Sequence, residues 1–180
     1  MLREAVMFAV KAHEGQVRKG TEIPYITHPL EAAVIASALT DDEEIRSAAV
    51  LHDVVEDAGI RKEELAVLFG ERVAGLVMSL SEDKSKSWQE RKDTAVRLAA
   101  EAPKDVKILV LCDKLSNMRS TARDYLMLGD RIWDRFNEKR KDRQADYYFG
   151  MAKALESLKK YPYYGEYLDL CRMVFGPENR

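Results

Sequence analysis

Cysteine, glycine and proline are scarce in this chain of 180 residues. The two cysteines, Cys112 and Cys171, are too few for a disulfide framework and too widely spaced for a close-spaced zinc motif. Nine glycines and five prolines favour long helices over turn-dense β-structure. We therefore expect an all-α fold in which the cysteines are bystanders, in a reducing cytoplasm.

Long apolar runs and an excess of positive charge are also missing. No run approaches the ~18 apolar residues that span a bilayer. The N-terminal segment MLREAVMFAVKAHEGQ carries charges among its apolar positions, unlike a signal peptide. The formal net charge of −2 argues against non-specific binding to nucleic acid. We expect neither membrane nor nucleic-acid partners, and the sequence leaves any oligomeric partner unknown.

Apolar residues at helical spacing recur along most of the chain. The expected helices span 2–14, 30–39, 43–58, 62–69, 71–80, 88–101, 104–122, 129–159 and 164–174. Gly129 and Gly150 are expected to interrupt the last long stretch, and breakers predict a non-helical segment over 15–27. Residues 1–160 are expected to form one domain, with 161–180 as a C-terminal helix and tail packed on it.

A dense group of acids accompanies a histidine in SAAVLHDVVEDAG, residues 47–59. On a continuous helix, four of its side chains would share an arc of about 140°. They are His52, Asp53, Glu56 and Asp57. Burying this face without a cation would be costly, whereas an ordinary amphipathic helix could turn it to water. This segment alone leaves both interpretations open.

Two further positions favour a metal site. His28 precedes Pro29, a residue that suits the first turn of a helix. Asp113 lies in the apolar segment KILVLCDKL, and a buried Asp is rare unless it is paired or coordinates a cation. With His52 and Asp53, these side chains supply two nitrogen and two oxygen donors. That set suits manganese or another moderately hard ion.

Five segments resemble, in order and spacing, the HD-domain hydrolases of RelA/SpoT-type alarmone enzymes. They are AHEGQVRKG, PYITHP, VLHDVVED, FGERVAGLV and LCDKLSNMRS. The segment SEDKSKSWQERK is closer to the free-standing small alarmone hydrolases. The resemblance covers residues 3–123 and implies a compact multi-helix HD-domain bundle.

The resemblance also implies a site and a reaction. It implies one manganese ion per chain, with the ligands His28, His52, Asp53 and Asp113. It implies an acidic pair that handles the attacking water, Glu56 and Asp57. The residues that match its substrate contacts are Arg18, Lys19, Tyr25 and Asn117. The implied substrate is a small-molecule nucleotide, guanosine tetra- or pentaphosphate, whose 3′-pyrophosphate is removed to give GDP or GTP plus pyrophosphate.

The residues by themselves leave alternatives open. Arg18 and Lys19 could be only a solvated pair in a loop. Tyr25 could pack beneath that loop instead of stacking on a guanine, and Asn117 could be a helix-packing amide. His13, the third histidine, is expected to have a structural role. The substrate could be another phosphorylated nucleotide, such as NADPH with its 2′-phosphate, or the protein could be a non-hydrolytic nucleotide-binding regulator.

Overall fold

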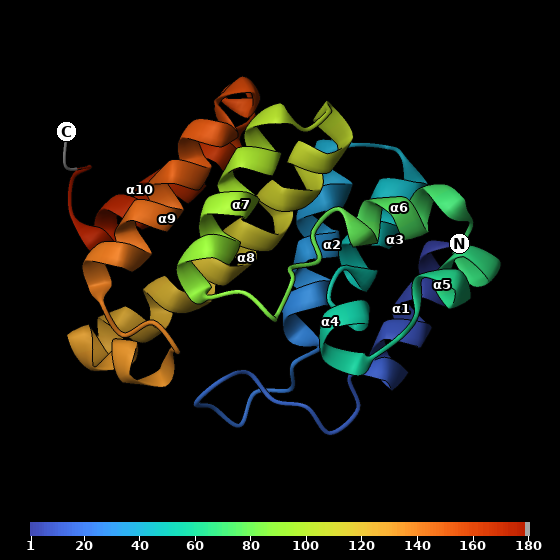
Figure 1. Cartoon of the computed structure of the whole chain (residues 1–180), viewed down its shortest axis with the longest axis horizontal. Helices are drawn as coiled ribbons and strands as arrows, with labels where there is room; N and C mark the ends of the chain where they lie inside the picture. Colours follow the sequence, from blue (N-terminus) through green and yellow to red (C-terminus); the bar gives the residue numbers. More distant parts are fainter. Residues whose placement is uncertain (179–180) are drawn as a thin grey trace. The chain divides into compact units, whose positions relative to one another are not determined.

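A computed structural model describes residues 1–178 of the chain (Figure 1). Within these residues, the one extended pairing is an isolated antiparallel bridge between Val17 and Pro24. The remaining regular structure is helical, so the expected all-α class is confirmed. None of the helices in this part of the chain combines the length and hydrophobicity needed to cross a bilayer. The end of the predicted tail, 179–180, lies outside the described residues.

The chain divides into two compact units. Unit 1 comprises Met1–Glu82 and Lys104–Asp113, and unit 2 comprises Asp83–Pro103 and the described residues from Lys114 onward. One long helix, α8 (Lys104–Leu128), contributes residues to both units. The expectation that residues 1–160 form a single domain stays a prediction.

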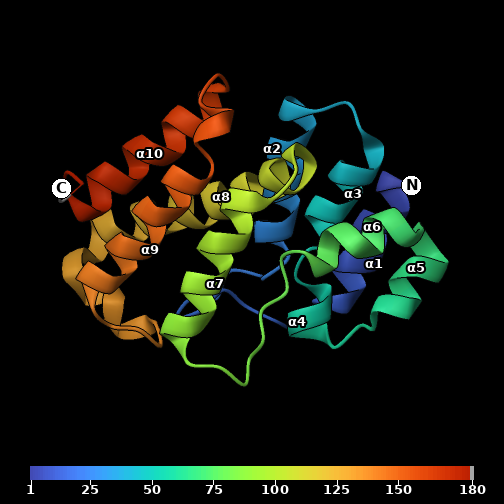
Figure 2. The ribbon, with the colours of Figure 1, turned by 45° about the horizontal axis from the view of Figure 1, so that its top comes forward.

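Unit 1 is organised around a short helix, α3 (Glu43–Leu51), whose second half is buried. Besides α3 and the start of α8, its helices are α1 (Leu2–Ala12), α2 (Thr27–Leu39), α4 (Val54–Ala58), α5 (Lys62–Phe69) and α6 (Glu71–Met78). Helix α3 packs against α1, α2 and α6 (Figure 2). Its Ala48 and Ala49 are inaccessible to solvent, and such small side chains let neighbouring helices approach closely. Asp42 caps α3 by accepting hydrogen bonds from two backbone amides of its first turn.

The expected helix over 43–58 is interrupted at its most polar residues. Helix α3 ends at Leu51, and His52 and Asp53 form a turn before α4 begins at Val54. The prediction of one continuous helix was therefore wrong. Both turn residues keep right-handed helical backbone angles. The helical spacing of apolar residues therefore continues through the turn, although the backbone hydrogen bonds of the helix are interrupted there. The carbonyl of Ala49 accepts a hydrogen bond from the His52 ring, which competes with the helical pattern.

Unit 2 packs its helices in a row. Besides the end of α8, it contains α7 (Trp88–Glu101), the 3₁₀ helix η1 (Gly129–Arg135), α9 (Lys141–Ala154), the 3₁₀ helix η2 (Glu156–Leu158) and α10 (Pro162–Phe175). Helix α9 contacts α7 on one side and α10 on the other, as both views show (Figures 1 and 2).

The interruption expected at Gly150 does not occur, and that prediction was wrong. Gly150 lies inside α9, and a Cβ atom there would meet the Val96 side chain of α7 at 3.6 Å. The glycine therefore accompanies close packing of two helices instead of ending one. Gly129 does end α8, with a positive φ of 56° that suits a residue without a side chain.

We predict that neither cysteine reacts with a chromogenic thiol reagent in the folded protein at neutral pH. Both thiols are free and inaccessible to solvent, and burial raises their pKa, that of Cys171 to about 12. Because the thiolate is the nucleophile, both should react only after denaturation. Comparing labelling rates in buffer and in denaturant checks this, and equal rates would contradict the burial of both side chains.

Candidate metal centre

Four side chains of unit 1 converge at one point, and we call them the His–Asp cluster: His28, His52, Asp53 and Asp113. The Nε2 atoms of the two histidines lie 3.1 Å apart. Asp113 Oδ1 lies 3.3 Å and 3.7 Å from the Nε2 atoms of His28 and His52. Asp53 Oδ2 lies 3.5 Å and 3.1 Å from the same two atoms. The structure thus brings together all four residues that the sequence suggested as ligands.

Three separate segments supply the His–Asp cluster. His28 lies in the first turn of α2, and Pro29 follows it. Amide hydrogens in the first turn of a helix have no partner within the helix, so a proline there loses no hydrogen bond. His52 and Asp53 come from the turn between α3 and α4. Asp113 follows the buried apolar residues of α8 and is only 7% exposed. A carboxylate held in such surroundings needs compensation by a cation or by hydrogen-bond donors.

The orientation of His52 is fixed by the backbone. Its Nδ1 lies 2.8 Å from the carbonyl oxygen of Ala49. A carbonyl can only accept, so Nδ1 carries a proton and Nε2 faces the cluster; when Nε2 is deprotonated, as metal binding requires, its lone pair points there. That lone pair and the carboxylate oxygens are all acceptors. The ligand atoms of His28, His52 and Asp113 lie within 4.8 Å of one another, so this group could hold a metal ion. The donor set fits a divalent cation.

The charges of the cluster reinforce one another. Burial lowers the pKa of His52, but the negative charges of Asp53 and Asp113 outweigh it and hold that pKa well above its ordinary value. Burial raises the pKa of Asp53, but His52 and His28 outweigh this effect and hold it well below its ordinary value. Asp53 is therefore ionised at neutral pH, as a metal ligand must be.

The two acids predicted for catalysis lie on α4, directly after the cluster. Glu56 Oε1 accepts a hydrogen bond from the backbone amide of Glu82, which anchors the Glu56 carboxylate. Asp57 is exposed, and its Oδ2 lies 3.0 Å from the hydroxyl oxygen of Tyr25. One carboxylate is thus tied to the backbone and the other to a side chain next to the cluster.

A hydrogen-bonded network that the sequence analysis did not identify supports the cluster. The Tyr25 hydroxyl donates to Asp53 Oδ2 at 2.7 Å, and burial together with Asp53 and Asp57 raises its pKa, so it stays a donor. Gln16 Nε2 donates to the Asp57 carbonyl, and Gln16 Oε1 lies 2.8 Å from His13 Nδ1. The His13 ring packs against Tyr25 at a centroid distance of 5.0 Å. His13 thus contacts two side chains that support the cluster, and its structural role stays a prediction. Gln16 was missed because a single loop amide has no recognisable sequence pattern.

The predicted substrate loop is folded back on itself. The bridge between Val17 and Pro24 closes the loop that carries Arg18 and Lys19. The Arg18 guanidinium lies 5.4 Å from the centre of the Tyr25 ring, a cation–π distance. Because Tyr25 also holds Asp53, Arg18 is positioned relative to the cluster through a single side chain. The phosphate contacts of Arg18 and Lys19 stay predictions.

Unit 2 contains the last predicted substrate residue and a second group of cations. Asn117 lies on α8, in the part of that helix that belongs to unit 2, and its nucleotide contact stays a prediction. In the same unit, the ammonium groups of Lys92 and Lys114 lie 5.0 Å and 5.7 Å from the centre of the Tyr147 ring.

Comparison with known families identifies the architecture around this cluster. A family model described as an HD domain matches residues 5–136, a range that includes every residue of the His–Asp cluster. The chain belongs to the HD-domain family. The family resemblance inferred from the sequence motifs is thereby confirmed.

Curated relatives of this HD domain share about two thirds of the chain. Guanosine-3′,5′-bis(diphosphate) 3′-pyrophosphohydrolase MESH1 of Drosophila melanogaster is 40% identical over 119 residues, 64% of this chain and 66% of the relative. MESH1 of Danio rerio is 41% identical over 127 residues, 68% of this chain and 70% of the relative. The bifunctional (p)ppGpp synthase/hydrolase SpoT of Escherichia coli K12 is 35% identical over 125 residues, but these are 18% of SpoT.

Solved structures extend the similarity over most of the chain. A metazoan ortholog of SpoT that hydrolyzes ppGpp matches with a TM-score of 0.78 and 30% identity, covering 95% of this chain and 93% of that one. A crystal structure from Listeria monocytogenes EGD-e matches with a TM-score of 0.77 and 31% identity, covering 83% and 99%. The fold of this HD domain is therefore shared with proteins from distant organisms.

We predict that His52→Gln abolishes tight binding of a divalent ion, whereas His13→Gln does not. Losing a direct ligand should weaken binding by more than the roughly 10–100-fold that loss of a supporting hydrogen bond costs. Titration calorimetry with manganese measures both affinities, and circular dichroism checks that each variant folds. Equal manganese affinity in wild type and His52→Gln would remove His52 from the ligand set.

Proposed function

We propose that this HD domain is a manganese-dependent phosphohydrolase that removes the 3′-pyrophosphate of guanosine tetra- and pentaphosphate. The observation that carries the proposal is the buried cluster of two histidines and two aspartates directly before an acidic pair. The names of the MESH1 and SpoT relatives support this substrate. The solved ortholog of SpoT that hydrolyzes ppGpp supports it as well.

The His–Asp cluster would hold one divalent ion per chain. Its members are His28, His52, Asp53 and Asp113. A ligand set of imidazole nitrogens and carboxylate oxygens suits manganese, whereas a thiolate-rich set would suit zinc. When bound, the ion supplies positive charge to phosphate oxygens and lowers the pKa of water.

Hydrolysis at the 3′ position requires two proton transfers. A water oxygen forms a bond to the phosphorus next to the 3′-oxygen, and the bond between that phosphorus and the 3′-oxygen breaks. One proton leaves the water and one is taken up by the 3′-oxygen, so the products are GDP or GTP and intact pyrophosphate. Glu56 and Asp57 are the acids that accept the first proton and return the second.

Cationic and polar side chains hold the nucleotide. Arg18 and Lys19 grip the pyrophosphate, since charge-assisted hydrogen bonds from a guanidinium and an ammonium suit phosphate oxygens. Tyr25 orients the Asp53 carboxylate through its hydroxyl and keeps the Arg18 guanidinium over its ring. Asn117 supplies a second contact to the nucleotide. We assign the activity to the cytoplasm, because the two free, buried thiols fit a reducing compartment.

We predict that Glu56→Gln retains manganese and substrate affinity but lowers turnover by about 10²–10⁴, the usual cost of losing a positioned acid or base. The amide keeps the size of the side chain and its hydrogen-bond acceptor for the Glu82 amide. Steady-state kinetics separate kcat from KM. The matched control is Glu63→Gln, an exposed glutamate on α5. Wild-type turnover in Glu56→Gln would exclude Glu56 from the chemistry.

We predict that incubation of guanosine tetraphosphate with the enzyme and manganese yields GDP and pyrophosphate, resolved by anion exchange. Orthophosphate as the first product would mean attack at the terminal phosphorus instead. In the same assay, Arg18→Ala should raise KM while leaving manganese affinity unchanged, because a guanidinium can bind phosphate oxygens but offers no lone pair to a metal ion.

The same assay separates the competing functions. Rapid cleavage of NADPH without cleavage of guanosine tetraphosphate would retain the hydrolase and replace its substrate. Binding of guanosine tetraphosphate with no turnover at any manganese concentration would favour a nucleotide-binding regulator.

A further inference from the structure

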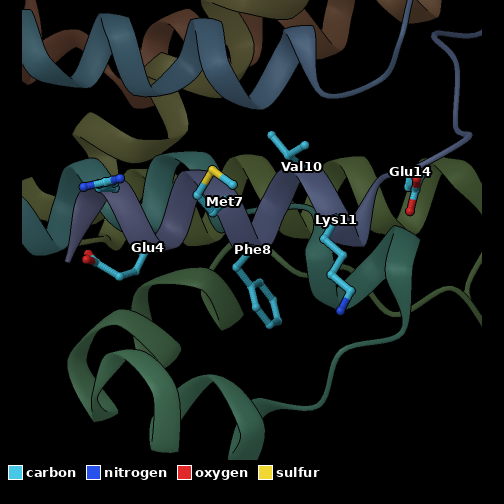
Figure 3. A pocket seen from close by; sticks show the side chains of 7 residues that line it. Glu4, Met7, Phe8, Val10, Lys11 and Glu14 are labelled. Carbon is cyan, nitrogen blue, oxygen red and sulfur yellow. The ribbon is translucent and has the colours of Figure 1, made fainter.

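Helix α1 has apolar residues on two faces. Its Ala5 and Ala9 are fully buried in unit 1, where α1 packs against α3. On the outer face, Met7 and Val10 are 65% and 43% exposed. Together with Phe8 they line an open groove of about 660 Å³ (Figure 3). Scattered apolar residues on a surface are ordinary, but these are grouped in one groove and bordered by charges.

Charges of opposite sign mark the two ends of the groove. Arg3, Met7 and Val10 follow one another at spacings of four and three residues, so they form one stripe along α1, and Glu14, in the turn directly after the helix ends at Ala12, extends it by a further four residues. All four are exposed. The stripe therefore reads positive, apolar, apolar, negative. Within residues 1–178, neither Arg3 nor Glu14 takes part in an ion pair.

A neighbouring stripe carries the reverse order of charge. It consists of Glu4, Phe8 and Lys11, which line the same groove. Figure 3 shows these three side chains on one side of the helix and Val10 on the other. This stripe reads negative, aromatic, positive from the N-terminal end, and its Glu4 carboxylate already lies 2.7 Å from the N-terminal ammonium of its own chain. Each stripe thus has opposite charges at its two ends. When two copies of one stripe lie antiparallel, opposite charges face each other.

One symmetry operation places both stripes against antiparallel copies of themselves. A two-fold axis perpendicular to α1 sets a second α1 antiparallel to the first, as in a closed isologous dimer. Arg3 then faces Glu14 of the second copy, and Met7 faces Val10. The mid-points of the two stripes are one residue apart along α1, which shifts the register of the second pairing by two residues, about 3 Å, so the same axis also brings Glu4 near Lys11. A parallel arrangement would bring like charges together.

We propose that this face of α1 binds a second copy of the same chain in an antiparallel, two-fold arrangement. Phe8 contacts Phe69 of α5 at a centroid distance of 5.5 Å, and the next residues back along α5, Leu68 and Val67, are 52% and 86% exposed. Helix α5, which Phe8 contacts, thus also carries exposed apolar side chains. The charge pattern selects the identical chain as partner, because it is complementary to itself.

Charge reversal tests the proposal by sedimentation over a range of concentrations. Wild type should dimerise, more weakly as salt rises. Arg3→Glu and Glu14→Arg should each weaken the dimer, by about 10–100-fold, because each turns two symmetry-related attractions into repulsions. An equimolar mixture of the two variants should form a heterodimer of near wild-type affinity, since both cross-pairs are attractive again.

Two further variants distinguish this surface from others. Met7→Asp should abolish the dimer by burying a charge, whereas Arg97→Glu, the same reversal at an exposed position on α7, should leave it unchanged. Circular dichroism and manganese binding check the fold of every variant. A wild type that stays monomeric at its highest soluble concentration would overturn the proposal. Single variants that dimerise like wild type, or a mixture that fails to recover, would overturn it as well.

Discussion

The structure of unit 1 depends on an electrostatic conflict at its centre. The Nε2 atoms of His28 and His52 lie 3.1–3.7 Å from each other and from the oxygens of Asp53 and Asp113. Lone pairs packed this closely in a buried place raise the free energy unless protons or a cation lie between them. A proton on His52 or a bound cation relieves this cost, and the surrounding elements hold the four side chains in place.

The supporting contacts link that centre to the groups that would meet a substrate. The Tyr25 hydroxyl joins Asp53, and its ring contacts both His13 and the Arg18 guanidinium. Gln16 ties the same loop to the backbone of α4. Since the loop, the cluster and the acidic pair share these side chains, a displacement of any one would disturb the others. This coupling gives a physical reason for the loop to follow directly on α1, whose inner face packs on α3.

Local chemistry explains which predictions from the sequence succeeded. The spacing of apolar residues predicts the helical segments. Because aspartate is rarely buried without a partner, the position of Asp113 in an apolar segment indicates a ligand or a paired group. The turn at His52 and Asp53 escaped prediction because its backbone angles stay helical. Gly150 was misjudged for a different reason. Gly150 packs against Val96 of another helix. The helix propensity of the residues around a glycine does not indicate such a tertiary neighbour.

The sequence by itself determined the helical class, the family and the chemical types of the candidate ligands, because periodicity, motif spacing and side-chain chemistry are local properties. The motifs implied that His28 and His52 meet across 24 residues, but tertiary structure alone decided that Tyr25 reaches Asp53 across 28. It also decided that Nδ1 of His52 carries the proton and that the charged stripe beginning at Arg3 faces outward. These features depend on which segments pack together, and packing is a property of the whole core.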